Sequence, residues 1–104
     1  MRLTGGCVYR AEVISNLSLE LDLHEHISRI EKDLGEYIYY SKIYNVKGKG
    51  RKGEKQGNAI WPEENFILII YTNNLVVIER LRSAIESLEQ EYPTEGIRFF
   101  VIGN

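Results

Sequence analysis

Two amphipathic helical patterns, each lying between strand-like segments, constrain the fold of this chain more than any other feature. In both patterns apolar residues recur every three or four positions, as on one face of a helix. The first pattern stops at Gly35 and consists of Leu19, Leu23, Ile27, Ile30 and Leu34. The second, which Asn73 or Asn74 can cap, stops at Pro93 and consists of Ile78, Leu81, Ile85, Leu88 and Tyr92. Each pattern predicts one helix with a single buried face.

Four further segments are rich in β-branched and aromatic residues, which is typical of strands. They are Val8–Ile14, Tyr37–Val46, Phe66–Tyr71 and Ile97–Ile102. In the first of them Arg10 and Glu12 fall on the same face, so that strand is expected to have one solvated side. Residues 66–71 are continuously apolar, which predicts a strand buried on both faces at the centre of a sheet.

The order of these elements is β, α, β, a long loop over residues 47–65, then β, α, β. Two successive β-α-β units pack most simply as a four-stranded antiparallel sheet with both helices on one face. The sequence therefore predicts an α+β, ferredoxin-like fold. Aromatic residues should put apolar surface on both sides of the sheet, including the uncovered face, through which subunits can associate. These are Tyr37, Tyr39, Tyr40, Tyr44, Phe99 and Phe100.

The length of 104 residues fits one domain spanning residues 1–104. No apolar run reaches the roughly 18 residues of a membrane-spanning helix, and residues 1–6 do not resemble a signal peptide. These features favour a cytoplasmic protein. Cys7 is the sole cysteine, which excludes an internal disulfide and a cysteine-based metal cage. With no positioned base nearby, Cys7 is interpreted as a packing residue.

Charge is unevenly distributed along the chain. The formal net charge is −2, but residues 47–55 carry five basic side chains against Glu54, so this segment has +4 and the remainder −6. An acidic body argues against general binding to nucleic acid or anionic membranes. The target of the positive charge is therefore expected to be local.

The basic segment also contains a glycine motif. Gly48 to Gly53 fits the pattern G-x-G-x-x-G, but no helical pattern follows, which excludes a dinucleotide-binding motif. A phosphate loop of the Walker type is excluded because Glu54 and Lys55 stand where Lys and Ser or Thr are required. Glycines still let backbone N–H groups approach an anion, and Arg51 offers a bidentate guanidinium. The alternative is that lysine and glycine only keep this loop soluble.

The same region resembles a known family. Tyr44–Gly53 is similar to the end of the second strand and the T-loop base of PII signalling proteins, where a V-K-G-x-G-R segment opens a long loop. Ile67–Val76 resembles their third strand and the start of the following helix. Arg98–Ile102 resembles their K-I-F-V-L strand after the B-loop.

The resemblance implies a non-enzymatic, homotrimeric regulatory protein that binds an adenine nucleotide between subunits, with or without magnesium. The ligand would be AMP, ADP, ATP or a cyclic nucleotide, and the T-loop would signal to a partner such as a membrane transporter or an enzyme. The residues carried over to the nucleotide site are Gly48, Gly50, Arg51, Lys52, Gly96 and Arg98. Adenine would rest on Leu68 or Ile70.

Within the loop, the residues predicted to bind the partner are Lys47, Lys49, Lys55 and Trp61. Trp61 could equally anchor the loop on the body of the protein. No residue is assigned a catalytic or metal-binding role.

Three departures from the PII pattern modify these expectations. No tyrosine lies between Val46 and Asn65, so the site of nucleotidylation found in some PII proteins is absent. The turn over residues 94–98 lacks the Gly-Asp-Gly-Lys sequence of the B-loop, and the C-terminal segment with basic phosphate contacts is missing after Asn104. Fewer cations favour AMP, ADP or a cyclic nucleotide over ATP, and a PII-like protein over a nitrogen regulator proper.

Two other classes of protein are considered as alternatives. Trp61–Leu68 resembles a strand of CutA, a related trimer implicated in divalent-metal tolerance. However, His24 and His26 lie about 200 degrees apart on a helix and cannot share an ion within one subunit, so solvent-facing histidines are favoured. RNA-recognition modules rank third, because residues 65–72 lack their aromatic signature and the pI is near 5.7.

An enzyme is less favoured than these binding functions. The chain has 15 acidic residues, but most fall on the predicted outer faces of the helices, where a solvated surface explains them.

Overall fold

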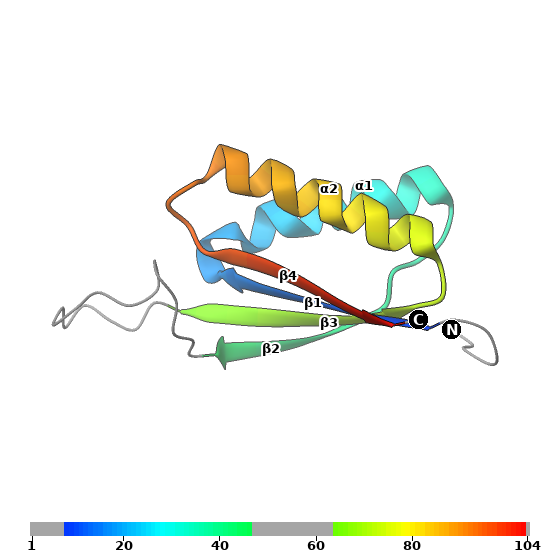
Figure 1. Cartoon of the computed structure of the whole chain (residues 1–104). Coiled ribbons are helices and arrows are strands. Elements are labelled where there is room, and N and C mark those ends of the chain that lie inside the picture. The colour runs from blue at the N-terminus through cyan, green and yellow to red at the C-terminus, as the bar shows by residue number, and fades with distance from the viewer. Residues whose placement is uncertain (1–7, 47–63, 104) are drawn as a thin grey trace, which may run out of the picture.

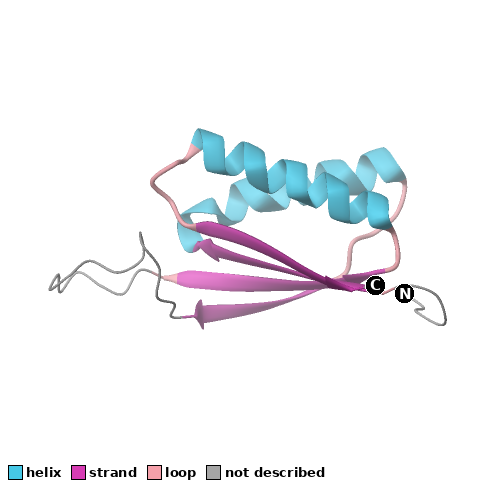
Figure 2. Cartoon of the chain, viewed as in Figure 1, coloured by secondary structure: helices cyan, strands magenta, loops and turns pink. Residues whose placement is uncertain are grey.

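The computed structural model describes residues 8–46 and 64–103, which form a four-stranded antiparallel sheet with two helices on one face (Figure 1, Figure 2). The predicted α+β, ferredoxin-like arrangement is confirmed. In chain order the elements are β1 (Tyr9–Asn16), the short 3-10 helix η1 (Leu17–Leu19), α1 (Glu20–Leu34), β2 (Tyr40–Val46), β3 (Asn65–Thr72), α2 (Leu75–Glu91) and β4 (Ile97–Gly103).

The strands are arranged in the order β2-β3-β1-β4, so β3 and β1 are central and β2 and β4 form the two edges. All neighbouring strands are antiparallel; Val13 of β1, for example, lies opposite Leu68 of β3 on one side and Phe99 of β4 on the other. This order follows from two β-α-β units whose helices cross the same face of the sheet.

The ends of the helices confirm the sequence signals. Gly35 adopts a left-handed conformation with φ of 67°, and its N–H donates to the carbonyl of Glu31 at 2.8 Å, which ends α1. At the start of α2 the side-chain oxygen of Asn74 accepts from the N–H of Val76 at 2.9 Å. Of the two predicted caps, Asn74 is therefore the one used.

The core lies between the sheet and the helices. Both predicted apolar stripes face it, and α1 contributes Leu23, Ile27 and Ile30. Along β3, Phe66, Leu68 and Ile70 are buried, whereas Ile67 and Ile69 on the other face are only half-buried. The central position of β3 is as predicted, but its burial on both faces is wrong within one chain, because the helices cover a single face.

The second strand also differs from its prediction, because it begins at Tyr40 rather than Tyr37. Ile38 inserts into the core, and its N–H donates to the carboxylate of Glu31 at 2.7 Å, so this stretch pairs with α1 instead of β3. Tyr37 and Tyr39 flank Ile38 in an exposed connection. Near the other end a bulge interrupts the pairing with β3, and Asn45 has a positive φ of 60°.

Neither described helix has the length and the apolar composition required to cross a membrane.

Candidate functional site

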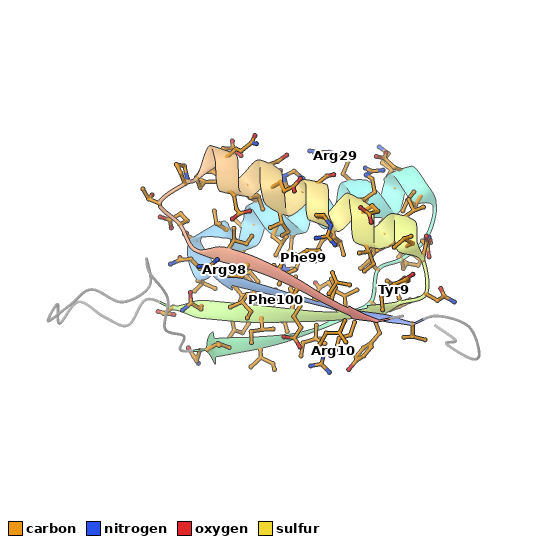
Figure 3. All side chains as sticks on the ribbon, viewed as in Figure 1. Tyr9, Arg10, Arg29, Arg98, Phe99 and Phe100 are labelled. Carbon is orange, nitrogen blue, oxygen red and sulfur yellow. The ribbon has the colours of Figure 1, made fainter. Side chains whose placement is uncertain are left out.

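Two of the predicted nucleotide-binding residues, Gly96 and Arg98, lie where β4 begins. The carbonyl of Gly96 accepts from the N–H of Asn16 at 2.8 Å, so it lies at the sheet end where β1 stops. Val46 and Asn65 are paired at this same end, where β2 stops and β3 starts. Figure 3 shows Arg98 at this end of the sheet. The end of β2, the start of β3 and the start of β4 therefore lie at one end of the sheet.

The remaining predicted binding residues lie outside the described part of the chain. They are Lys47, Gly48, Lys49, Gly50, Arg51, Lys52, Lys55 and Trp61. The packing interpretation of Cys7 also falls outside it.

Gly96 and Val46 lie on opposite edges of the sheet. In the order β2-β3-β1-β4 three strand spacings separate them, which amounts to about 14 Å. A phosphate group is much smaller than this gap. Within one chain, Gly96 and Val46 are therefore poorly placed to hold the same phosphate.

The turn that precedes β4 is acidic. The Ser18 hydroxyl donates to the Glu95 carboxylate at 2.5 Å, which ties the turn to η1. Nearby, the negative charges of Asp22 and Glu91 raise the pKa of Tyr92 above its usual value. A phosphate at this turn would need compensating positive charge from elsewhere.

Arg98 is an available cation beside this turn. It is exposed, and within residues 8–46 and 64–103 it makes no hydrogen bond or ion pair. It borders an open groove of about 330 Å³ between α2 and β4, in which the Arg82 guanidinium lies 5.4 Å from the ring centre of Phe99. Arg98 can therefore contact an anion without breaking an interaction with any other described residue.

The residues predicted to contact adenine are not available. Leu68 and Ile70 have no exposed surface, because their side chains point into the core beneath the helices. The prediction that adenine rests on either residue is therefore wrong. Side chains alternate between the two faces of a strand, and Leu68 and Ile70 lie on the face that the helices cover. Because residues 66–71 of β3 are continuously apolar, the sequence did not show which of them would face the helices.

A polar cluster that sequence reasoning missed joins β2 to α1. It comprises Glu20, His24, Lys42 and Tyr44, and we refer to it as the Lys42 cluster. The Lys42 ammonium donates to the Glu20 carboxylate at 2.5 Å, contacts His24 Nε2 at 2.6 Å and donates to the Tyr44 hydroxyl at 3.3 Å. The Tyr44 hydroxyl also donates to Glu20. The sequence held one signal for this cluster, which is a lysine between two tyrosines in a predicted strand. Its partners, Glu20 and His24, are spaced i, i+4 on the preceding helix.

The charge states in the Lys42 cluster follow from these contacts. Hydrogen bonds from Lys42 and Tyr44 lower the pKa of Glu20. Burial opposes the charge on Lys42, but the bonds to Glu20 and Tyr44 outweigh it and raise the pKa of Lys42. Partial burial and the Lys42 charge lower the pKa of His24, despite Glu20 nearby. The structure thus favours a charged Glu20–Lys42 pair beside a neutral His24.

His24 therefore does not simply face solvent, contrary to the sequence interpretation. Besides Lys42, it contacts the ring of Tyr40 at 5.5 Å between ring centres. In the described parts of the chain, no three His, Cys, Asp or Glu side chains converge in a way that could hold a metal ion.

This fold is that of the PII-like proteins, as the sequence resemblance implied. CPII from Thiomonas intermedia K12, solved with ADP, AMP and acetate, matches with a TM-score of 0.68 and 12% identity over 94% of this chain and 86% of CPII. A PII-like signalling protein from Thermus thermophilus matches with a TM-score of 0.58 and 16% identity over 94% of this chain and 87% of its own.

The shared fold does not by itself establish the function. No protein-family model matches the sequence, and no curated protein matches it. The de novo designed protein Foldit4 also matches, with a TM-score of 0.55 and 12% identity over 93% of this chain and 97% of the design. The same arrangement of strands and helices therefore also forms in a designed sequence, and function must be argued from the residues of the site.

Proposed function

We propose that this chain, as a single domain, is a PII-like regulatory protein that binds an adenine nucleotide and signals to a partner protein through residues 47–65. The observation that carries the proposal is the placement of Gly96 and Arg98 at the sheet end where β2 leads into the basic segment 47–55. The fold it shares with CPII, which was solved with ADP and AMP, supports this ligand class.

A homotrimer would bring the two halves of the site together. Rotation about an axis parallel to the strands keeps the same sheet end of every copy on the same side. If copies meet edge to edge, β4 of one copy lies beside β2 of the next. Gly96 and Arg98 would then approach Val46 of the neighbour to within one or two strand spacings, about 5–10 Å. This is shorter than the separation within one chain, so the nucleotide site is proposed to lie between subunits.

The charges at this end favour a nucleotide with few phosphates. The turn before β4 contributes Glu95, while the positive charge comes from Arg98 and from the basic segment, including Arg51 and Lys52. The glycines at 48 and 50 would allow backbone N–H groups to approach a phosphate. We therefore propose AMP, ADP or a cyclic nucleotide as better ligands than ATP, with magnesium optional.

The proposed role is regulatory and not enzymatic. Nucleotide binding would change the surface offered by residues 47–65, including Lys47, Lys49, Lys55 and Trp61, to a transporter or an enzyme. A cytoplasmic location is part of this proposal, because adenine nucleotides are cytoplasmic ligands and a protein partner must be met there.

Calorimetric titration with AMP, ADP, ATP and cyclic AMP tests the ligand. Arg51→Ala and Arg98→Ala should each weaken binding by about tenfold or more, because each removes a charged phosphate contact. Arg29→Ala is the matched control, since Arg29 is an exposed arginine on α1 away from the sheet end (Figure 3). It should leave affinity unchanged.

Two results would overturn the proposal. One is that none of the four nucleotides binds the wild-type chain. The other is a monomer by native mass spectrometry at micromolar concentration, since the site would then lack its second half. Heat from divalent metal alone would favour the CutA-like alternative, and a salt-sensitive shift with RNA would favour the RNA-binding one.

A further inference from the structure

The edge strand β2 is weakly attached to the rest of the fold. Within one chain its backbone pairs with β3 on one side, and none of the described residues forms a strand on the other. Within residues 8–46 and 64–103, Lys42 forms the one ion pair that joins β2 to a helix, through Glu20 at 2.5 Å. Edge strands held by a single ladder open locally at low free-energy cost. The position of β2 therefore depends strongly on the Lys42 cluster.

The geometry of the Lys42 cluster suits such a role. The Lys42 side chain is only 17% exposed, and its ammonium contacts three groups on α1 and β2 at 2.5–3.3 Å. It also lies 5.8 Å from the ring centre of Phe66, which belongs to β3 and the core. One side chain thus links α1, β2 and β3. Removing it would leave Glu20 as a half-buried carboxylate without its cation, which destabilises the local arrangement.

This link lies close to the place where the strand ends. Lys42 is four residues before Val46, and between them Asn45 forms a bulge with a positive φ. Bulges redirect the chain, so the direction in which β2 ends depends on how its last residues are held.

We propose that Glu20 and Lys42 are positioning residues, which hold the end of β2 in place and thereby set the affinity of the nucleotide site. The proposal rests on the function proposed above. Neither Glu20 nor Lys42 contacts the nucleotide in this role. If β2 is correctly placed in only a fraction of molecules, the apparent affinity falls by that fraction.

The test compares Lys42→Met with Arg80→Met. Arg80 pairs with Asp33 at 2.7 Å and joins α1 to α2, so its loss removes an ion pair between elements without touching β2. Lys42→Met should speed amide hydrogen exchange over residues 40–46 and weaken AMP or ADP binding about tenfold, as when one molecule in ten has β2 in place. Arg80→Met should change neither. Lys42→Arg, which can still pair with Glu20, should restore most of both properties.

Amide hydrogen exchange and nucleotide affinity together distinguish a failure of the positioning role from a failure of the proposed function. Unchanged exchange over residues 40–46 in Lys42→Met would overturn the positioning role. Faster exchange with unchanged affinity would also overturn it, because β2 would then not control the site. If the wild-type chain binds no nucleotide, the proposed function fails, and exchange alone decides whether Lys42 positions β2.

Discussion

The two faces of the sheet differ sharply, although the same strands form both. On the face beneath the helices, Val13, Leu68 and Ile70 have no exposed surface. On the open face, Ile43 is 48% exposed and Phe100 is 51% exposed. The covered face is thus complete within one chain, whereas none of the described residues covers the apolar surface of the open face. The difference teaches that one side of these strands completes the core of a single chain, while the other side offers apolar surface with which a second copy could associate.

The open face also carries charged groups of its own, away from the helices. Arg10 donates to the carboxylate of Glu12 at 2.9 Å and to the hydroxyl of Tyr71 at 2.6 Å, and Figure 3 shows it projecting away from the helices. These polar groups lie toward the sheet end opposite Gly96, since Tyr9 pairs with Gly103 there. An apolar region beside a polar region gives a surface that can associate in a defined orientation.

The largest expected effect is a cavity on the covered face. Leu68→Ala should destabilise the chain by about 3–5 kcal/mol, because it removes a fully buried side chain from a packed core. Ile69→Ala, one residue along the same strand but on the open face, should cost clearly less in a monomer. Urea denaturation followed by circular dichroism measures both. Equal losses at high dilution would contradict the distinction between the faces.

A charge on the open face should affect association more than folding. Phe100→Asp should shift the protein toward monomers, because burying an unpaired carboxylate between copies costs several kcal/mol. Leu21→Asp is the control, since Leu21 is 79% exposed on α1, away from the open face. Sedimentation velocity measures the change, and unchanged circular dichroism shows that the fold is kept. If both variants associate like the wild-type chain, the open face is not the interface.

The smallest expected effect is a pH dependence on the helix side of β2. The pKa of His24 is lowered from 6.5 in the fold, so the unfolded chain takes up this proton first and stability falls as pH drops below about 6.5. Glu20 has a lowered pKa and contributes only at more acidic pH, below about 4.5. The urea concentration at the midpoint of unfolding should therefore be lower at pH 5.5 than at pH 7.5.

His24→Gln removes the titrating ring but keeps an acceptor for Lys42. In this variant the free energy of unfolding should fall less between pH 7.5 and pH 5.5 than in the wild-type chain. The difference should be less than about 1 kcal/mol. An undiminished drop in His24→Gln would assign the pH dependence to other groups.

Sequence patterns predicted the fold more fully than the site. Both helices, the cap at Asn74 and the left-handed Gly35 depend on local periodicity and capping, which neighbouring residues specify. Errors arose where long-range contacts decided the outcome. Ile38 packs in the core and its N–H donates to Glu31, so β2 starts only at Tyr40, and Leu68 was assigned to a ligand although it faces the helices.

By itself, the sequence determined the order of elements, the α+β class and the basic glycine motif, because each is encoded in residues close together along the chain. Only the tertiary structure decided which face of each strand is buried, which end of the sheet collects Gly96 and Val46, and that Lys42 meets Glu20. These depend on strand register and helix packing, which bring together residues far apart in the sequence, such as Glu20 with Lys42 and Asn16 with Gly96. A pleated strand exchanges its two faces with a shift of one residue, so local patterns cannot specify them alone.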